Sequence, residues 1–248
     1  MENDVFKILS NRASIRAFKD EPVSDELVMT VLSAAASGPN MNNFQPVTFI
    51  EITDQAVKDE ITERVGMRYI AGAPWFFVLA IDYNKLFVGA TPEQAAVMAE
   101  NLAWYNMTEG ALISAGIALE NAVLAANAVG LGAVTMAGAV RPLDFLQDTL
   151  QLPKFVKPVM GLSLGYPDQE PGVKPKLPVK GGFWMTDKYD QAALEGAVAT
   201  YNDTMREYFA GRGIDEDWTE HNMKMVATTA KDNSLATQHL HDKGFATK

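Results

Sequence analysis

Arg12, Ser14 and Arg16 stand at alternate positions in the stretch NRASIRAF, near the start of a chain whose formal net charge is −10. An arginine guanidinium presents a planar fork of N–H donors that matches phosphate oxygens, and a serine hydroxyl adds another donor. On one helical turn, Arg12 and Arg16 would face the same side because they are four residues apart. The pattern therefore indicates a cup for an anionic group such as a phosphate. Its alternative is a solvated helix end.

A second candidate is the polar loop GPNMNNFQPVTF, residues 38–49, which leads into an apolar run. Its asparagine and glutamine side chains supply both donors and acceptors, which suits a heterocycle whose edges carry both kinds of group. The alternative is a turn-rich loop whose side chains bond its own backbone. Taken alone, this loop favours the second interpretation.

A third candidate is the segment GVKPKLP, residues 172–178, which proline stiffens into an extended form. Lys174 and Lys176 could contact two different parts of one ligand from such a segment. The alternative is a solubilising loop, which is the better interpretation of this segment in isolation.

Other kinds of chemistry find little support. The chain has no cysteine, which removes disulfides, iron–sulfur clusters, thiolate nucleophiles and cysteine-based zinc sites. The histidines, His221, His239 and His241, show no metal-ligand spacing, since residues two apart do not share a helix face. We therefore predict no metal site. The motifs of a Walker loop and a dinucleotide-binding turn do not occur.

The charge balance bears on partners and location. With 21 basic against 31 acidic residues, the chain lacks the basic surface that recruits nucleic acid or an anionic membrane. The amino-terminal stretch MENDVFKILSNR has no basic start followed by an apolar run, so we expect no secretory signal. A cytoplasmic location is the resulting expectation.

The elements that must position these residues alternate between strands and helices. Apolar and β-branched runs predict strands at 47–53, 75–83, 132–138 and 157–167, and capped amphipathic patterns predict helices at 24–38, 54–66 and 187–213. We therefore expect an α+β protein with one main structural domain. Its core spans 1–182 and a helical extension spans 183–248. The proline-rich stretch 166–182 is either a linker or an ordered loop.

The stretch 108–132 is apolar on almost every face, with Thr108 as its expected cap. A helix of that kind must be buried on all sides, so we expect it between the sheet and a second subunit. A membrane span is the alternative, and it is disfavoured because Glu120, Asn121 and Asn127 interrupt the run.

In this order and spacing, the pieces resemble the nitroreductase family of flavin enzymes, and within it the oxygen-insensitive NADPH nitroreductases and flavin reductases. The resemblance covers almost the whole chain and is carried by NRASIRAF, AASGPNMNNFQPVTF, GLGAVTMAG, LSLGYPDQEPGVKPKLP and LHDKGFATK. It implies a central mixed or antiparallel sheet flanked by helices, in an intertwined homodimer with a carboxyl-terminal extension. FMN would be tightly bound at the subunit interface, in a site built from both chains.

Carried over residue by residue, the resemblance assigns the FMN phosphate to Arg12, Ser14, Arg16 and Lys176. It places Lys174 near the N1–O2 edge of the flavin ring, where a positive charge stabilises developing negative charge. The other positions that it places against the flavin are Asn40, Met41 and Asn42, from the other subunit, and Met67, Tyr69, Met136, Ala137 and Gly138. No side chain is expected to be catalytic in itself, because the cofactor carries the chemistry.

The activity that the resemblance implies is hydride transfer from NADPH or NADH through flavin N5 to small aromatic acceptors. Nitroaromatics, quinones and free flavins form that acceptor class, and a shared open ring face implies ping-pong kinetics. A flavin-binding or storage protein without efficient turnover is the alternative on the same scaffold. A third interpretation is an anion-binding module or structural oligomer without flavin.

Two positions depart from the group's pattern. Met67 stands where the group usually has a glutamine, which removes a polar contact to the ring. The stretch WTEHNMKMV, residues 218–226, lies where the group has paired arginines for the 2′-phosphate of NADPH, and only Lys224 remains there. Because one lysine matches phosphate less well than paired arginines, we expect an enzyme that accepts both nicotinamide coenzymes, with Lys224 as the phosphate contact.

Overall fold

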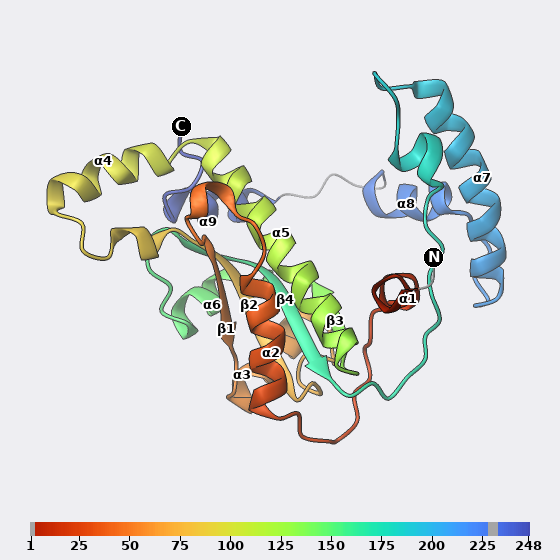
Figure 1. The fold of residues 1–248 in the computed structure, drawn as a ribbon, viewed down its shortest axis with the longest axis horizontal. Helices are drawn as coiled ribbons and strands as arrows, with labels where there is room; N and C mark the ends of the chain where they lie inside the picture. Colours follow the sequence, from red (N-terminus) through yellow and green to blue (C-terminus); the bar gives the residue numbers. More distant parts are fainter. Residues whose placement is uncertain (1–2, 228–232) are drawn as a thin grey trace. The chain divides into compact units, whose positions relative to one another are not determined.

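The computed structural model describes residues 3–227 and 233–248 (Figure 1). Strands and helices alternate between residues 47 and 165, and helices without strands precede and follow that region. The strands are β1 (Val47–Glu51), β2 (Trp75–Asp82), β3 (Gly132–Met136) and β4 (Val156–Gly165). The helices are α1 (Asp4–Asn11), α2 (Asp25–Ala36), α3 (Gln55–Val65), α4 (Pro92–Leu102), α5 (Tyr105–Ala128), α6 (Leu143–Thr149), α7 (Gln191–Ala210), α8 (Trp218–Val226) and α9 (Ser234–Asp242).

The strands form one four-stranded sheet within the described residues, in the order β1-β2-β4-β3. Each neighbouring pair is antiparallel, so the expected α+β class is confirmed and the sheet is antiparallel throughout. The strands begin and end within two residues of the expected ranges. β2 lies inside the sheet and is almost wholly buried, which is why its sequence is a continuous apolar run.

Helices cover both faces of the sheet (Figure 1). The side chains of β2 point alternately to these two faces. Phe77, Leu79 and Ile81 point into a core shared with α2 and α5. Phe76 and Val78 point to the other face, into a core with residues from α3 and α6. Because side chains alternate along a strand, one apolar strand can hold the two helical layers together.

Local signals set several helix ends as the sequence predicts. The Ser24 hydroxyl accepts a hydrogen bond from the Leu27 amide at the start of α2, and Asp54 accepts one from the Ala56 amide at the start of α3. Each bond satisfies an amide that has no partner inside the helix. Gly66 ends α3 with φ 72°, a left-handed conformation that glycine adopts without a steric penalty.

Helix α5 differs from its expected form. It begins at Tyr105, so the prediction that Thr108 caps it is wrong. Thr108 lies inside the helix at 2% exposure and serves packing rather than capping. One side of α5 is buried against the sheet and α2, while Leu112 and Ile113 are exposed at 45% and 65%. A single chain therefore buries only one side of this apolar helix.

By length and composition α5 could cross a membrane, and it is the one helix among the described residues that could. Its inner side nevertheless belongs to the core, where Ala111, Ala115 and Ala122 are buried in the same cluster as Leu79 of β2. Small side chains at these positions let the helix lie close to its neighbours. Because its inner side packs into the core of the first unit, we interpret α5 as a core helix whose composition is as apolar as that of a membrane span.

The chain divides into two compact units, the first made of residues up to 171 together with 233–248, the second of residues from 172 to 232. The first contains the sheet and its helices, and the carboxyl terminus is anchored there. Lys243 donates hydrogen bonds to the carbonyls of Leu152 and Pro153 at 2.6 and 3.2 Å, and Phe245 is fully buried. In the second unit, Tyr201, Met205 and Phe209 of α7 form a separate small core with Leu177 and Trp218.

Candidate active site

The segment Arg12–Arg16 is extended and follows α1 directly. Arg12 ends the helix with extended backbone angles, Ser14 forms a β-bridge with Ala133, and the Ile15 amide donates to the Ala133 carbonyl at 3.0 Å. The two arginines therefore do not lie on one helical turn, because this segment pairs with β3. Alternate residues of an extended chain point the same way, so this pairing is consistent with Arg12, Ser14 and Arg16 sharing a side.

Gly132 allows this segment to lie against the sheet. A Cβ atom at Gly132 would stand 2.7–2.9 Å from three side-chain atoms of Ile15, which is too close for any real contact. Ile15 is 8% exposed and anchors the segment from the face opposite to Arg12, Ser14 and Arg16. The sequence shows a glycine-rich turn here, but its purpose depends on a contact with residues more than a hundred positions earlier.

Two further pairs of predicted site residues meet in the first unit. The Arg16 guanidinium carbon lies 5.9 Å from the centroid of the Tyr69 ring. A Cβ atom at Gly138 would stand 2.2 Å from the terminal methyl of Met67, so Met67 packs directly on the Gly138 backbone. The turn after α3 thus lies beside both the amino-terminal segment and the end of β3.

At the end of β3, the groups that a ligand could contact belong to the backbone more than to side chains. The Met136 side chain is 3% exposed and lies in the core beside Phe76 and Val134. A ligand at this strand end would therefore meet the backbone of Met136, the exposed Ala137 and the backbone of Gly138. Backbone amides and carbonyls can hydrogen-bond the mixed edge of a heterocycle.

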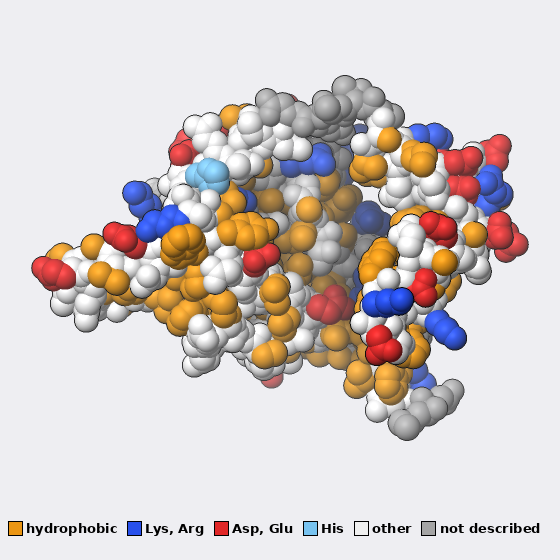
Figure 2. Space-filling model, turned by 90° about the horizontal axis from the view of Figure 1, so that it is seen from above, with side chains coloured by type: hydrophobic (Ala, Val, Ile, Leu, Met, Phe, Trp, Pro, Cys, Tyr) orange, Lys and Arg blue, Asp and Glu red, His pale blue; other side chains and the backbone are white. Residues whose placement is uncertain are grey.

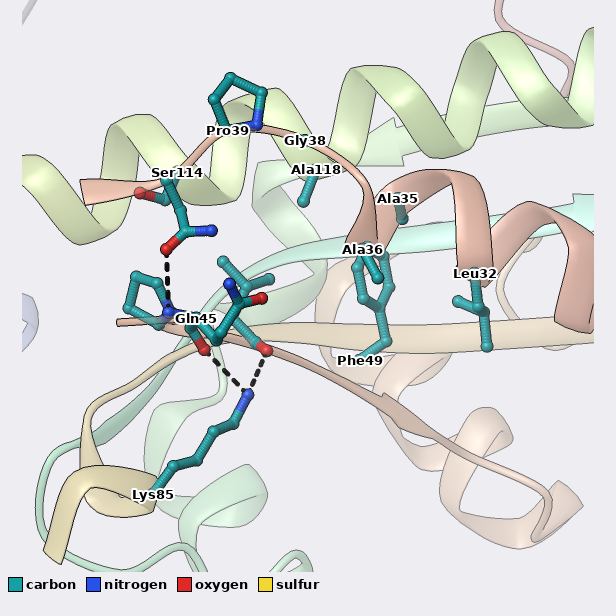
Figure 3. Close-up of a pocket in the computed structure, with 13 residues that line it drawn as sticks. Leu32, Ala35, Ala36, Gly38, Pro39, Gln45, Phe49, Lys85, Ser114 and Ala118 are labelled. Carbon is teal, nitrogen blue, oxygen red and sulfur yellow. Dashed lines mark hydrogen bonds between the residues drawn. The ribbon is translucent and has the colours of Figure 1, made fainter. Parts of the chain in front are cut away.

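The loop with Asn40, Met41 and Asn42 borders a cavity of about 190 Å³ between α2, α5 and β1 (Figure 3). Its backbone is held by the Asn40 side chain, which accepts from the Gln45 amide at 2.9 Å. Lys85 donates to the carbonyls of Gln45 and Val47 at 3.0 and 2.6 Å. Residues that line the cavity include Leu32, Ala35, Asn40, Phe49, Ser114 and Ala118.

This loop is tightly constrained. Asn42, Asn43 and Gln45 have positive φ values of 49°, 56° and 52°, and asparagine tolerates this left-handed conformation better than most residues. Burial lowers the pKa of Lys85 from its usual value, while the nearby Asp82 opposes that shift. The Lys85 ammonium therefore braces the backbone of the loop through the carbonyls of Gln45 and Val47, and its side chain also lines the cavity.

The sheet register separates this loop from the arginine segment. Val47, just after the loop, pairs with Ile81, which pairs with Lys157 of β4. Ala133, the partner of Ser14, pairs with Leu164 at the other end of β4. At the usual rise of a strand, Lys157 and Leu164 lie about 23 Å apart. Within one chain, Asn40–Asn42 and Arg12–Arg16 are therefore at opposite ends of the sheet.

Lys174 and Lys176 belong to the second unit, in a segment held against α7. The Tyr201 hydroxyl donates to the Pro175 carbonyl at 2.8 Å, and the Lys174 ammonium lies 5.4 Å from the centroid of the Phe209 ring. Lys176 is exposed. This anchoring fixes the backbone between the two lysines and leaves both charges at the surface of the unit.

Lys224 also belongs to the second unit, where its ammonium donates to Oε2 of Glu216. That bond, and the negative charge behind it, raises the pKa of Lys224. The sequence reasoning missed Glu216, although the acidic run Asp215–Asp217 just before the helix was a visible signal. Across the residues that the structure describes, no group of three or more histidine or acidic side chains is placed to hold a metal ion.

The chain belongs to the nitroreductase family. The model of that family matches residues 9–166, and the model of its carboxyl-terminal domain matches residues 174–248. Together the two matches contain every residue singled out above from Arg12 to Lys224.

Curated relatives cover nearly the whole chain. The oxygen-insensitive NADPH nitroreductase of Salmonella typhimurium is 30% identical over 247 residues, 98% of each protein. The FMN reductase of Bacillus subtilis, named for NAD(P)H, is 34% identical over 213 residues, covering 85% of this chain and 84% of that protein.

Solved structures share the fold. Nitroreductase A from Vibrio parahaemolyticus superposes with a TM-score of 0.88 at 25% identity and full coverage of both chains. The NADPH:FMN oxidoreductase from Vibrio harveyi, solved in complex with NAD+, gives 0.86 at 26% identity, covering 99% of this chain and all of the other. These likenesses confirm the nitroreductase-like fold that the sequence predicts.

Proposed function

We propose that the chain is an FMN-dependent NAD(P)H oxidoreductase that reduces nitroaromatics, quinones or free flavins. Family membership and the names of the relatives support this activity. The observation that carries it in the structure is the segment pinned to β3 at Ser14 and Ile15, because extended backbone there would set Arg12, Ser14 and Arg16 on one side. A storage protein without turnover is not favoured, because the named relatives are reductases.

The donor set of this segment fits a phosphate monoester. Two guanidinium groups and a hydroxyl offer directed donors to a doubly charged group, and charge-assisted bonds of this kind are stronger than neutral ones. Arg12 and Ser14 are half-buried and Arg16 is exposed, so the group remains accessible from solvent. Lys176 of the second unit is the proposed fourth contact to the phosphate.

The proposed site draws on two copies of the chain. Asn40, Met41 and Asn42 cannot reach a ligand held by Arg12 and Arg16 of the same chain, because the sheet register puts them at opposite ends. A homodimer would bring the loop of one chain to the arginine segment of the other. The exposed apolar side of α5 supports the same arrangement, and Figure 2 shows hydrophobic side chains reaching the surface of the first unit.

The residues near the ring have supporting roles. Bound FMN would supply hydride acceptance at N5 and delivery to an acceptor. Tyr69, beside Arg16, and Met67, packed on Gly138, would form the wall that orients the ring, while the backbone of residues 136–138 would bond its polar edge. Lys174 would place a positive charge near N1–O2, where it counts for more than in bulk water.

No side chain is proposed to exchange protons or electrons with the substrate. Donor and acceptor would use one open face in turn, which gives ping-pong kinetics, and flat aromatic molecules would be accepted with little selectivity. In this proposal the protein is a cytoplasmic homodimer. NADPH and NADH would both serve as donors, with Lys224 contacting the 2′-phosphate of NADPH.

Purification tests the cofactor and the assembly together. The protein should be yellow, elute as a dimer, and release one FMN per chain on denaturation. FMN is distinguished from FAD and riboflavin by chromatography of the released flavin. A colourless protein that does not take up added FMN would overturn the proposal.

A further inference from the structure

Glu216 is buried at the junction of α7 and α8, and both of its carboxylate oxygens are engaged. Its relative exposure is 6%. Oε1 lies 2.6 Å from Nδ1 of His221, and Oε2 accepts a hydrogen bond from the Lys224 ammonium. Lys224 itself is largely exposed, at 67% of its side-chain surface. A buried acid therefore holds an exposed cation at the surface of the second unit.

The surroundings of this pair are acidic. Arg206 of α7 bonds Asp217 at 2.7 Å and lies 3.8 Å from Glu220, so its charge is already balanced by carboxylates. Asp215 and Glu220 also act electrostatically on Lys224, in the same direction as Glu216. Asp and Glu side chains are visible across the surface of this unit in Figure 2.

We infer that Glu216 is a specificity-determining residue for the nicotinamide coenzyme: it holds Lys224 in an ion pair and so disfavours the 2′-phosphate of NADPH. The inference rests on the proposed function, in which Lys224 is the contact for that phosphate. We therefore expect this chain to use NADH at least as well as NADPH. A site with paired arginines for the 2′-phosphate would instead favour NADPH.

The physical reason is a competition for one cation. NADPH and NADH differ only in the 2′-phosphate, which carries a charge of about −1.5 to −2 near neutral pH. To bind it, Lys224 must leave Glu216 or share its ammonium with a second anion, and either change weakens a charge-assisted hydrogen bond to a carboxylate that is only 6% exposed. If the pair stays closed, the phosphate approaches Glu216, Glu220 and Asp215 and is repelled. NADH lacks the 2′-phosphate, so its binding neither disturbs the Glu216–Lys224 ion pair nor is opposed by these carboxylates.

Glu216→Gln tests the inference, because glutamine keeps the size and hydrogen-bonding capacity of the side chain while removing its charge. Binding of NADP+ and NAD+ to the FMN-loaded protein is measured by isothermal titration calorimetry. We expect the NADP+/NAD+ affinity ratio to rise about tenfold, equivalent to about 1.4 kcal/mol. The steady-state ratio of kcat/KM for NADPH over NADH should rise in parallel, through KM, since the 2′-phosphate is remote from the nicotinamide.

Two further variants identify the cause. Adding Lys224→Ala to Glu216→Gln should remove the gain, since the released ammonium is what binds the phosphate. Glu195→Gln, at an exposed position of α7, removes the same charge from the same unit and should leave both ratios as in the parent protein. A general effect of net charge would instead move the ratios in both variants alike, and that result would overturn the inference.

The possible failures are distinguishable. If NADH or NADPH reduces the flavin but Glu216→Gln leaves both ratios unchanged, the inference is wrong and the proposed function stands. The same holds if the gain persists in the double variant. If neither coenzyme reduces the flavin of the parent protein, the proposed function fails and the inference fails with it.

Discussion

The guanidinium of Arg16 lies over the ring of Tyr69, with 5.9 Å between the guanidinium carbon and the ring centroid. This contact joins the amino-terminal segment to the turn that follows α3. A cation over an aromatic face is stabilised by the ring's negative face, so the two side chains hold each other in place. In the proposed site, Arg16 would bind the phosphate of FMN while Tyr69 lies beside its ring.

Replacing Arg16 with alanine should weaken FMN binding far more than it slows hydride transfer. A charge-assisted hydrogen bond contributes about 1.5–3 kcal/mol, so the dissociation constant for FMN should rise about 10- to 100-fold. The rate of flavin reduction by NADH, measured by stopped-flow on protein saturated with FMN, should change little by comparison. Flavin fluorescence titration gives the binding constant.

Lys19→Ala is the matched control for Arg16, because it removes one exposed positive charge only three residues away. It should leave FMN affinity within about twofold, since screening weakens interactions between exposed, separated charges. Equal losses of affinity in Lys19→Ala and Arg16→Ala would show that net charge, and not a phosphate contact, controls binding.

Gly132→Ala should destabilise the protein and weaken FMN binding together. The added Cβ would collide with Ile15, and overpacking of this kind costs about 1–3 kcal/mol. Because Ile15 anchors the segment with Arg12, Ser14 and Arg16, its displacement should also disturb the phosphate contacts. Urea unfolding and FMN titration measure the two effects.

Gly196→Ala provides the comparison for Gly132. Gly196 lies inside α7, and no atom stands within 4 Å of a Cβ built there. Alanine should stabilise this helix by about 0.5–1 kcal/mol without changing FMN affinity. A Gly132→Ala protein as stable as the parent would contradict the close packing of Ile15 against the start of β3.

A charge on the outer side of α5 should separate the proposed dimer. Ile113→Glu places a carboxylate at a position that is 65% exposed in the single chain, so the fold of one chain tolerates it. Burial of that charge at an interface is unfavourable. We expect a monomer by analytical ultracentrifugation, together with loss of FMN, because the loop of the second chain is then missing.

Thr237→Glu is the control, because it adds the same charge at an exposed position of α9, and this protein should remain dimeric. A dimeric Ile113→Glu protein with bound FMN would exclude α5 from the interface.

The pair Glu216 and Lys224 should make stability depend on pH at acidic values. Hydrogen bonds from Lys224 and then His221 lower the pKa of Glu216 below its ordinary value of 4.5. Between the lowered folded value and 4.5, the unfolded state binds more protons. This contribution to stability is thus fully present above pH 4.5 and is lost as the pH falls through the folded pKa.

In the Glu216→Gln protein, the fall of the urea midpoint below pH 4.5 should be shallower than in the parent protein. Tryptophan fluorescence reports the transition, since Trp218 begins α8 and its ring lies 5.5 Å from that of Tyr201. Identical acid profiles for the two proteins would mean that Glu216 and Lys224 do not interact in solution.

Much of the fold could be predicted because its signals are local. The apolar run of β2 reports burial on both sides, and Ser24 and Asp54 are caps that act within two or three residues. The start of α5 was mispredicted because Thr108 is a good capping residue by type. Its burial against the core, which decides its role, depends on tertiary packing.

The candidate site was predictable in part for the same reason. The residue types in the arginine segment indicate a phosphate, but the extended backbone comes from pairing between Ser14 and Ala133, which no local pattern shows. The pair Glu216 and Lys224 depends on the fold of the second unit. Residue types therefore led to the phosphate hypothesis, which stays a prediction, and only the structure showed that Lys224 is already engaged by a carboxylate.

Anaerobic titration of the purified, FMN-containing protein tests the central claim most directly. Addition of NADH or NADPH should bleach the flavin absorbance near 450 nm with about one equivalent per flavin, as two-electron reduction requires. Addition of a quinone or nitroaromatic, after the nicotinamide is consumed, should restore the absorbance. A flavin that neither coenzyme bleaches, although dithionite does, would contradict the account.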